Sequence, residues 1–227
     1  MELVINFSGG KDSCAMLAYI CEHWPDAKKH VVFANTGWEH TDAEEWSRKI
    51  VSMFGLKLHV VKNPNKTFLT MVSNRGMFPS PDNRQCTSDL KRDPITTWTR
   101  RNVKDKVVVN CMGLRADESP ARKKKKRLAR NKRQSNTRRT IWDWLPIHDW
   151  SEARVLAYLQ EKGIPLHPVY QYLNRFSCRV CIYMSDHDLR QVNIHDPEAI
   201  EIISNLEVKT GFTMKPGKSV KEIINYK

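Results

Sequence analysis

The chain has 227 residues, of which 40% are hydrophobic and 28% are charged, a composition typical of a globular domain with a sizeable core. No run approaches the roughly 18 consecutive apolar residues of a membrane span, and no basic region precedes the short apolar stretch at the N-terminus, so we expect neither a membrane anchor nor a signal peptide. The six cysteines are then more typical of thiols or metal ligands in a cytoplasmic protein than of a disulfide framework.

Short runs rich in β-branched residues alternate with helical patterns through the first 150 residues. The predicted buried strands are residues 3–7, 31–34, 58–61, 107–109 and 141–147. The predicted helices are residues 13–23 and 41–54, and the second opens on a capping box at Thr41. Strands separated by helices predict an α/β fold: an open, mostly parallel sheet with helices on both faces.

The rest of the chain is predicted to be mainly helical. One helix opens at Ser151, and another opens at Asp196 and is stopped by Gly211. We therefore expect two parts, an α/β nucleotide-binding core over residues 1–150 and a smaller helical region over residues 151–227 that carries a Cys-x-x-Cys pair.

The positive charge is concentrated in one segment. The chain has 38 Lys and Arg against 25 Asp and Glu, a net charge of +13. Residues 122–139 hold 11 basic and no acidic side chains, so the remaining chain is nearly neutral. We call residues 122–139 the basic segment. Such a segment repels itself, which is typical of a solvated flexible loop or an address signal, but it also binds polyanions such as nucleic acid.

The first predicted strand runs directly into a glycine turn over residues 8–13, and a helix follows. Adjacent glycines allow a ligand to approach the backbone, whose N–H groups at a helix N-terminus form a nest for phosphate oxygens. A lysine adds a point charge, two serines add donors, and an aspartate can help hold Mg²⁺. The spacing differs from that of a Walker A loop. We expect nucleotide phosphates to be bound by Ser8, Gly9, Gly10, Lys11, Asp12 and Ser13.

This loop resembles the PP-loop of the adenine nucleotide alpha hydrolase superfamily, whose members cleave ATP between the α- and β-phosphates and form adenylates. Further motifs resemble the branch that contains PAPS reductases and sulfate adenylyltransferases: Asn35-Thr36-Gly37, and segments within residues 84–95, 113–122 and 145–150. The resemblance covers about residues 3–212. It implies binding of ATP and Mg²⁺, with further nucleotide contacts from Asn35, Thr36, Gly37, Gly113 and Arg115. It also implies that Lys11, Asp12 and Arg115 are catalytic.

Two features depart from the pattern of the PAPS reductases that this chain resembles. Those reductases typically have a degenerate phosphate loop, because their substrate has no pyrophosphate, whereas the loop here is intact. They also carry a catalytic cysteine near the C-terminus, whereas the last cysteine here is Cys181. In addition, Asn35 stands where an acidic residue is usual. Both main departures argue against simple PAPS reduction, and the intact loop favours ATP as the ligand.

The cysteines divide into two groups. Cys14, Cys21 and Cys111 lie within predicted core elements, where a free cysteine packs as a small hydrophobic residue.

The other three, Cys86, Cys178 and Cys181, lie in basic surroundings that favour thiolates. The resemblance implies that these three hold a [4Fe–4S] cluster with one iron left open. The alternatives are a redox disulfide and a zinc site completed by His187, His167 or His195.

Together these features predict an ATP-dependent sulfurtransferase that adenylates tRNA or DNA and takes sulfur from a donor protein or sulfide. A homo-oligomer is a further hypothesis. The alternatives are a PAPS or APS reductase, a sulfate adenylyltransferase small subunit, and a nucleic-acid-binding subunit that only senses ATP or redox state. The side chains predicted to bind nucleic acid are Arg122, Lys123, Lys124, Lys125, Lys126, Arg127, Arg130, Lys132, Arg133, Arg138 and Arg139.

Overall fold

The computed structural model describes residues 1–176 and 178–225, and the chain separates into two compact units. The first unit comprises residues 1–34, 42–61 and 95–167, and the second comprises residues 35–41, 62–94 and 168–227. The predicted division was a single boundary near residue 150. The units are instead discontinuous, because segments that follow the second and third strands join the second core.

The first unit is built on one six-stranded sheet, which confirms the predicted α/β class. The strand order is β3-β2-β1-β4-β6-β5. Strands β2, β1, β4 and β6 pair in parallel along this order, and β5 pairs antiparallel to β6 at the edge. The strands are β1 (Glu2–Phe7), β2 (Lys28–Asn35), β3 (Leu58–Lys62), β4 (Val107–Met112), β5 (Leu128–Arg130) and β6 (Thr140–Trp144).

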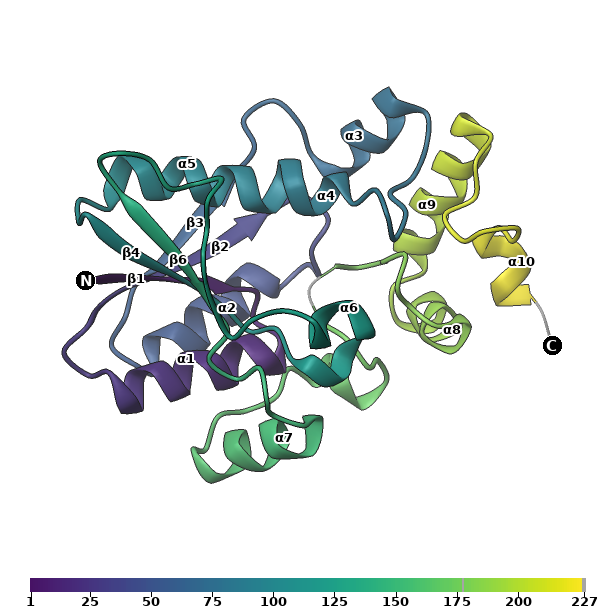
Figure 1. Ribbon diagram of the computed structural model, residues 1–227. Helices are drawn as coiled ribbons and strands as arrows, with labels where there is room; N and C mark the ends of the chain where they lie inside the picture. Colours follow the sequence, from purple (N-terminus) through teal and green to yellow (C-terminus); the bar gives the residue numbers. More distant parts are fainter. Residues whose placement is uncertain (177, 226–227) are drawn as a thin grey trace. The chain divides into compact units, whose positions relative to one another are not determined.

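Helices of the first unit cover both faces of the sheet. In Figure 1, α5 lies on one side of the strands, and α1 and α2 lie on the other. Val4, Val32 and Ile141 pack against Ile95 and Val103 of the α5 segment. The helical elements are α1 (Lys11–His23), α2 (Ala43–Ser52), α5 (Asp93–Asn102), the 3₁₀ turn η2 (Ala116–Glu118), α6 (Pro120–Lys123) and α7 (Glu152–Glu161).

The second unit is helical around its own apolar core, which includes Trp38, Leu90, Leu189 and Ile203. Its elements are α3 (Phe68–Arg75), α4 (Gln85–Thr87), the π turn η1 (Ser88–Arg92), the 3₁₀ turn η3 (Pro168–Gln171), α8 (Asp186–His195), α9 (Pro197–Thr210) and α10 (Val220–Asn225). No helix among the described residues is long and apolar enough to cross a membrane.

The predicted helix ends are correct in part. Ser151 caps α7 by accepting from the amide of Arg154, and Gly211 ends α9 in the left-handed conformation. The predicted capping box at Thr41 is wrong: α2 begins at Ala43 with Asp42 as N-cap, and no side chain caps it. Asp42 accepts a hydrogen bond from His167 instead.

The basic segment is folded, so the flexible-loop interpretation is wrong. It contributes β5, which pairs with β6 over three residues. Asn131 donates to Asp143, and Gln134 donates to Thr96 on α5. Arg139 donates to the carbonyl of Val103 just after α5, where the helix dipole favours a cation. Hydrogen bonds and strand pairing thus offset the crowding of positive charge.

The carboxylate of Glu2 connects the start of β1 to β2 and to the segment before β4. This buried carboxylate contacts His30 at 2.5 Å and Lys28 at 3.0 Å and accepts from the amides of Lys104 and Asp105. Burial works to raise the pKa of Glu2, but these partners outweigh it and lower the pKa to about 2.

Because the folded pKa lies below the ordinary value of 4.5, Glu2 stabilises the fold above pH 4.5, and that stabilisation is lost as pH falls toward 2. We expect Glu2→Gln to lower the free energy of unfolding by about 1–3 kcal/mol at pH 7 and by much less near pH 2. Urea titrations at both pH values measure this. An equal loss at both would contradict the assignment.

Candidate functional site

The predicted phosphate loop joins β1 to α1 as a tight turn. Gly9 has a φ of 77°, a conformation that favours glycine, and α1 begins at Lys11 with Gly10 as its N-cap. The Ser13 hydroxyl donates to the carbonyl of Gly10 at 2.8 Å, and the amide of Ser8 donates to the Ser13 oxygen at 3.3 Å. The loop is thus held in shape by its own hydrogen bonds.

Lys11 is buried at the start of α1, with 8% of its surface exposed. Its ammonium lies 3.2 Å from a carboxylate oxygen of Glu152, in the first turn of α7, and 3.9 Å from Asp12. No sequence pattern pointed to this contact, which joins the first turns of α1 and α7.

Arg115 is buried beside the loop and is neutralised by two carboxylates. Its Nε lies 2.5 Å from Asp12 Oδ1, and its Nη1 pairs with Asp117. Burial works to lower the pKa of Arg115, but Asp12 and Asp117 outweigh it and raise that pKa. Glu118 accepts from the backbone amide of Arg115 at 2.8 Å. Asp12, expected to help hold Mg²⁺, is thus bound to Arg115 here.

Two neighbours hold the loop from outside. A Cβ on Gly113 would lie 3.0 Å from the carbonyl oxygen of Asp12, so a side chain here would push the loop backbone away. Trp46 on α2 donates its indole N–H to the carbonyl of Gly9 at 3.1 Å, and its ring meets His167 edge-on at 5.0 Å.

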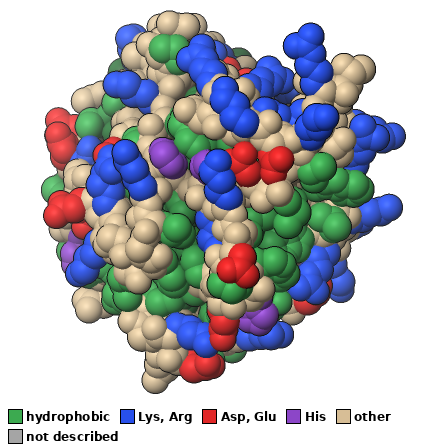
Figure 2. All heavy atoms as spheres, turned by 90° about the vertical axis from the view of Figure 1, so that its left-hand side faces the viewer, with side chains coloured by type: hydrophobic (Ala, Val, Ile, Leu, Met, Phe, Trp, Pro, Cys, Tyr) green, Lys and Arg blue, Asp and Glu red, His purple; other side chains and the backbone are tan. Residues whose placement is uncertain are grey.

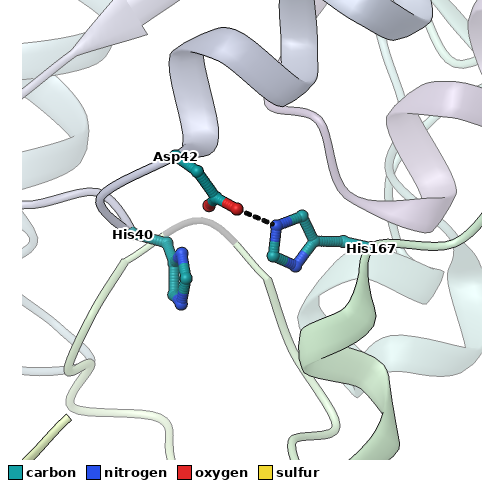
Figure 3. Close-up of side chains that lie close together, drawn as sticks. All are labelled: His40, Asp42 and His167. Atoms are coloured by element: carbon teal, nitrogen blue, oxygen red, sulfur yellow. Dashed lines mark hydrogen bonds and ion pairs between the residues drawn. The ribbon is translucent and has the colours of Figure 1, made fainter.

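Behind Trp46, His167 lies 2.9 Å from Asp42, and Figure 3 shows its ring directed at that carboxylate. The sequence suggested His167 as a zinc ligand, but here it belongs to the support of the loop. His40, also drawn in Figure 3, belongs to the second unit.

The turn over residues 35–37 lies in the second unit. The side chain of Asn35 accepts from the amide of Gly37, whose φ is 74°. The amide and hydroxyl of Thr36 both donate to Glu39, at 2.8 Å each. Hydrogen bonds to its own side chains, Asn35 and Glu39, therefore hold this turn in shape.

The second unit also gathers the three predicted cluster ligands. Cys178 and Cys181 share a hydrogen bond in which the Cys178 thiol donates, which lowers the pKa of Cys181 and raises that of Cys178. Burial raises the pKa of Cys86, whose charge interacts with that of Cys181. The loop that carries the pair is fixed by Trp38, whose indole donates to the Val180 carbonyl at 3.0 Å.

Lys91 brings a cation to these thiols, and sequence reasoning assigned it no role. Its ammonium lies 3.9 Å from Cys178 Sγ and 3.7 Å from Glu39. Burial works to lower the pKa of Lys91, but Cys178, Glu39 and the other two thiols outweigh it and raise that pKa. The charge of one ammonium thus interacts with all three thiols.

The other cysteines agree with a structural role. Cys14 and Cys111 are buried, and burial raises the pKa of Cys14 to about 12 and that of Cys111 further. Cys21 is half-buried, and burial raises its pKa too.

The other two histidines named as alternative zinc ligands also lie in the second unit. The ring of His195 stacks on Tyr172 at 3.8 Å, and His187 lines a shallow polar cavity of about 290 Å³.

The basic segment divides into paired and unpaired side chains. Arg122 pairs with Glu118, Arg127 contacts Asp149 at 3.3 Å, and Arg139 binds the end of α5. Across the described ranges 1–176 and 178–225, eight side chains of the segment form no hydrogen bond or ion pair: Lys123, Lys124, Lys125, Lys126, Arg130, Lys132, Arg133 and Arg138.

All eight of these residues are exposed. On the face of the molecule drawn in Figure 2, Lys and Arg side chains are spread widely, and Asp and Glu gather in smaller groups. The eight unpaired cations therefore leave much of the segment's charge uncompensated among the described residues.

Comparisons with known proteins agree with this architecture. An uncharacterized 37.8 kDa protein of Escherichia phage 186 is 25% identical over 271 residues, covering 95% of this chain and 77% of the relative. Among solved structures, a PAPS reductase from Candida auris in complex with phosphate has a TM-score of 0.56 at 16% identity, covering 78% of this chain and 81% of that one.

The U34-tRNA thiolase NcsA from Methanococcus maripaludis, solved with its [4Fe–4S] cluster, has a TM-score of 0.52 at 16% identity, covering 99% of this chain and 69% of that one. At such identities the two solved structures show a shared fold. The model of the phosphoadenosine phosphosulfate reductase domain matches residues 2–183. This match spans most of the chain, and the protein therefore belongs to the phosphoadenosine phosphosulfate reductase domain family.

Proposed function

We propose that this protein is an ATP-dependent sulfurtransferase that acts on nucleic acid. A substrate oxygen attacks the α-phosphorus of ATP and pyrophosphate leaves; a sulfur nucleophile then attacks the activated carbon and AMP leaves. The observation that carries this proposal is the intact phosphate loop, with Lys11 held at the start of α1. A sulfonucleotide reductase, which the chain resembles in other motifs, has no pyrophosphate to bind.

In this reaction the backbone of Gly9 and Gly10 would hold the pyrophosphate oxygens, because the start of α1 offers unpaired N–H groups and a favourable dipole. Lys11 would leave Glu152 for the phosphates and stabilise the charge that develops during adenylyl transfer. Arg115 would act through Asp12, since both its carboxylate partners already neutralise it. Mg²⁺ would be held mainly by phosphate oxygens.

We propose that Cys86, Cys178 and Cys181 hold a [4Fe–4S] cluster, a group that fits their three sulfur donors and the neighbouring cation of Lys91. When bound, such a cluster would supply an open iron at which sulfur can be carried. Lys91 would offset the negative charge of the thiolates. The tRNA thiolase from Methanococcus maripaludis, similar in fold, holds a cluster of this type.

We propose tRNA or DNA as the substrate on the basis of the eight unpaired basic side chains. That thiolase is named for a tRNA. A sulfonucleotide reductase is the second candidate, which the family model favours. Against it stands the lack of any cysteine after Cys181.

The first prediction concerns Lys11. We expect Lys11→Ala to weaken ATP binding by roughly 10- to 150-fold and to abolish turnover, because a charged hydrogen bond to phosphate is lost. Glu152→Gln should instead strengthen ATP binding, because it removes the competitor for the ammonium. Titration calorimetry measures both, with Lys57→Ala as an exposed control. Unchanged ATP affinity in Lys11→Ala would refute the phosphate-loop assignment.

The second prediction concerns the cysteines. Protein purified without oxygen should be brown, with broad absorption near ~400 nm. Replacing Cys86, Cys178 or Cys181 by alanine should remove the colour and the iron. The control variant Cys21→Ala, on α1, should leave both unchanged. Absorption spectra and elemental analysis check this. Colourless protein with stoichiometric zinc would favour the zinc alternative.

The third prediction concerns the four consecutive lysines at residues 123–126. Replacing all four by serine should make the plot of log affinity against log salt for tRNA shallower by about 3, since each phosphate contact contributes roughly 0.7–0.9. A matched variant removes four exposed lysines elsewhere: Lys57, Lys62, Lys106 and Lys221. Equal slopes for the two variants would argue against a specific role for the basic segment.

A further inference from the structure

Two tryptophans stand beside the basic segment at the edge of the sheet. Trp142 and Trp144 are two residues apart on β6 and therefore share one face. Strand β5 places Arg130 opposite Trp142 and Leu128 opposite Trp144. Ile141, the residue before Trp142, points to the opposite face and belongs to the core with Ile95 of α5.

This face of β5 and β6 is accessible. Leu128 is 54% exposed, Arg130 is exposed, and both tryptophans are half-buried. Within the described part of the chain, the indole N–H of Trp142 makes no hydrogen bond. The ring of Trp144 is held edge-on by Trp24, with ring centres 4.7 Å apart and an angle of 79°. Because this contact with Trp24 restricts the Trp144 ring, less conformational freedom remains to be lost on binding.

The charge around this face is positive. Arg130 and the lysines of the basic segment have no acidic partner in the described residues. The nearest acidic residue on β6 is Asp143, which alternates to the opposite face and accepts from Asn110 and Asn131. Aromatic rings flanked by unpaired cations are the combination that binds unpaired bases and their phosphates.

We propose that Trp142 and Trp144 form a stacking platform for the bases of a single strand, while Arg130 and the neighbouring lysines hold its phosphates. This inference rests on the proposed nucleic acid substrate and narrows it to unpaired segments. Residues two apart on a strand are about 6.8 Å apart, roughly twice the 3.4 Å repeat of stacked bases. Bases that occupy both rings must therefore be unstacked from each other, as they are in a loop and not in a duplex.

The test compares a short thymidine oligonucleotide with a duplex of the same length. We expect Trp142→Leu to weaken binding of the single strand about tenfold and binding of the duplex much less. The matched control is Trp98→Leu, a half-buried tryptophan on α5 that packs against the opposite face beside His59. A second variant, Trp142→Phe, keeps an aromatic ring and should retain most of the affinity and the native melting temperature.

The outcomes separate this inference from the proposed function. If Trp142→Leu binds the single strand more weakly but the duplex as the parent does, and Trp142→Phe keeps most of the affinity, the platform is supported. If Trp142→Leu binds the single strand as the parent does, while the Lys123–Lys126 variant binds it more weakly, the platform is refuted and the nucleic acid substrate stands. Equal weakening for strand and duplex also refutes the platform. If the parent binds neither probe, both ideas fail.

Discussion

The contact between Arg115 and Asp12 is the interaction on which the candidate nucleotide site depends. It ties the segment after β4 to the first turn of α1 through a 2.5 Å ion pair, and Gly113 permits the approach because a Cβ there would crowd the Asp12 carbonyl. A buried pair of this kind costs desolvation, which its further partner Asp117 helps to offset. The phosphate loop is therefore shaped before any ligand arrives, as electrostatic stabilisation of a transition state requires.

Each charged group near the two candidate sites is balanced by a group that a ligand can displace or complement. In the first unit Glu152 holds Lys11 where phosphates would bind. In the second unit Glu39 and Cys178 surround the ammonium of Lys91. Local neutralisation keeps a buried lysine charged without a ligand. The basic segment differs, because most of its cations have no such partner, and this difference favours a large external polyanion.

Local patterns predicted the fold well, and long-range contacts explain what they missed. Buried strands and the glycine turn are encoded within a few residues, so both were recognised. No local pattern relates Lys11 to Glu152 on α7, or shows that Arg139 would bind the end of α5. The capping box at Thr41 failed because α2 begins one residue later, with Asp42 as its N-cap, and Glu44 pairs with Arg48 instead. The roles of the recognised motif residues in binding and catalysis remain predictions.

The most direct test of the central claim is the identity of the products formed from ATP in the presence of tRNA or single-stranded DNA. Phosphorus NMR of the reaction mixture distinguishes cleavage at the α-phosphorus from cleavage at the γ-phosphorus. An adenylating enzyme should release AMP and pyrophosphate in equal amounts, with release dependent on the nucleic acid. Formation of ADP and phosphate, or no ATP cleavage together with reduction of a sulfonucleotide, would contradict the account.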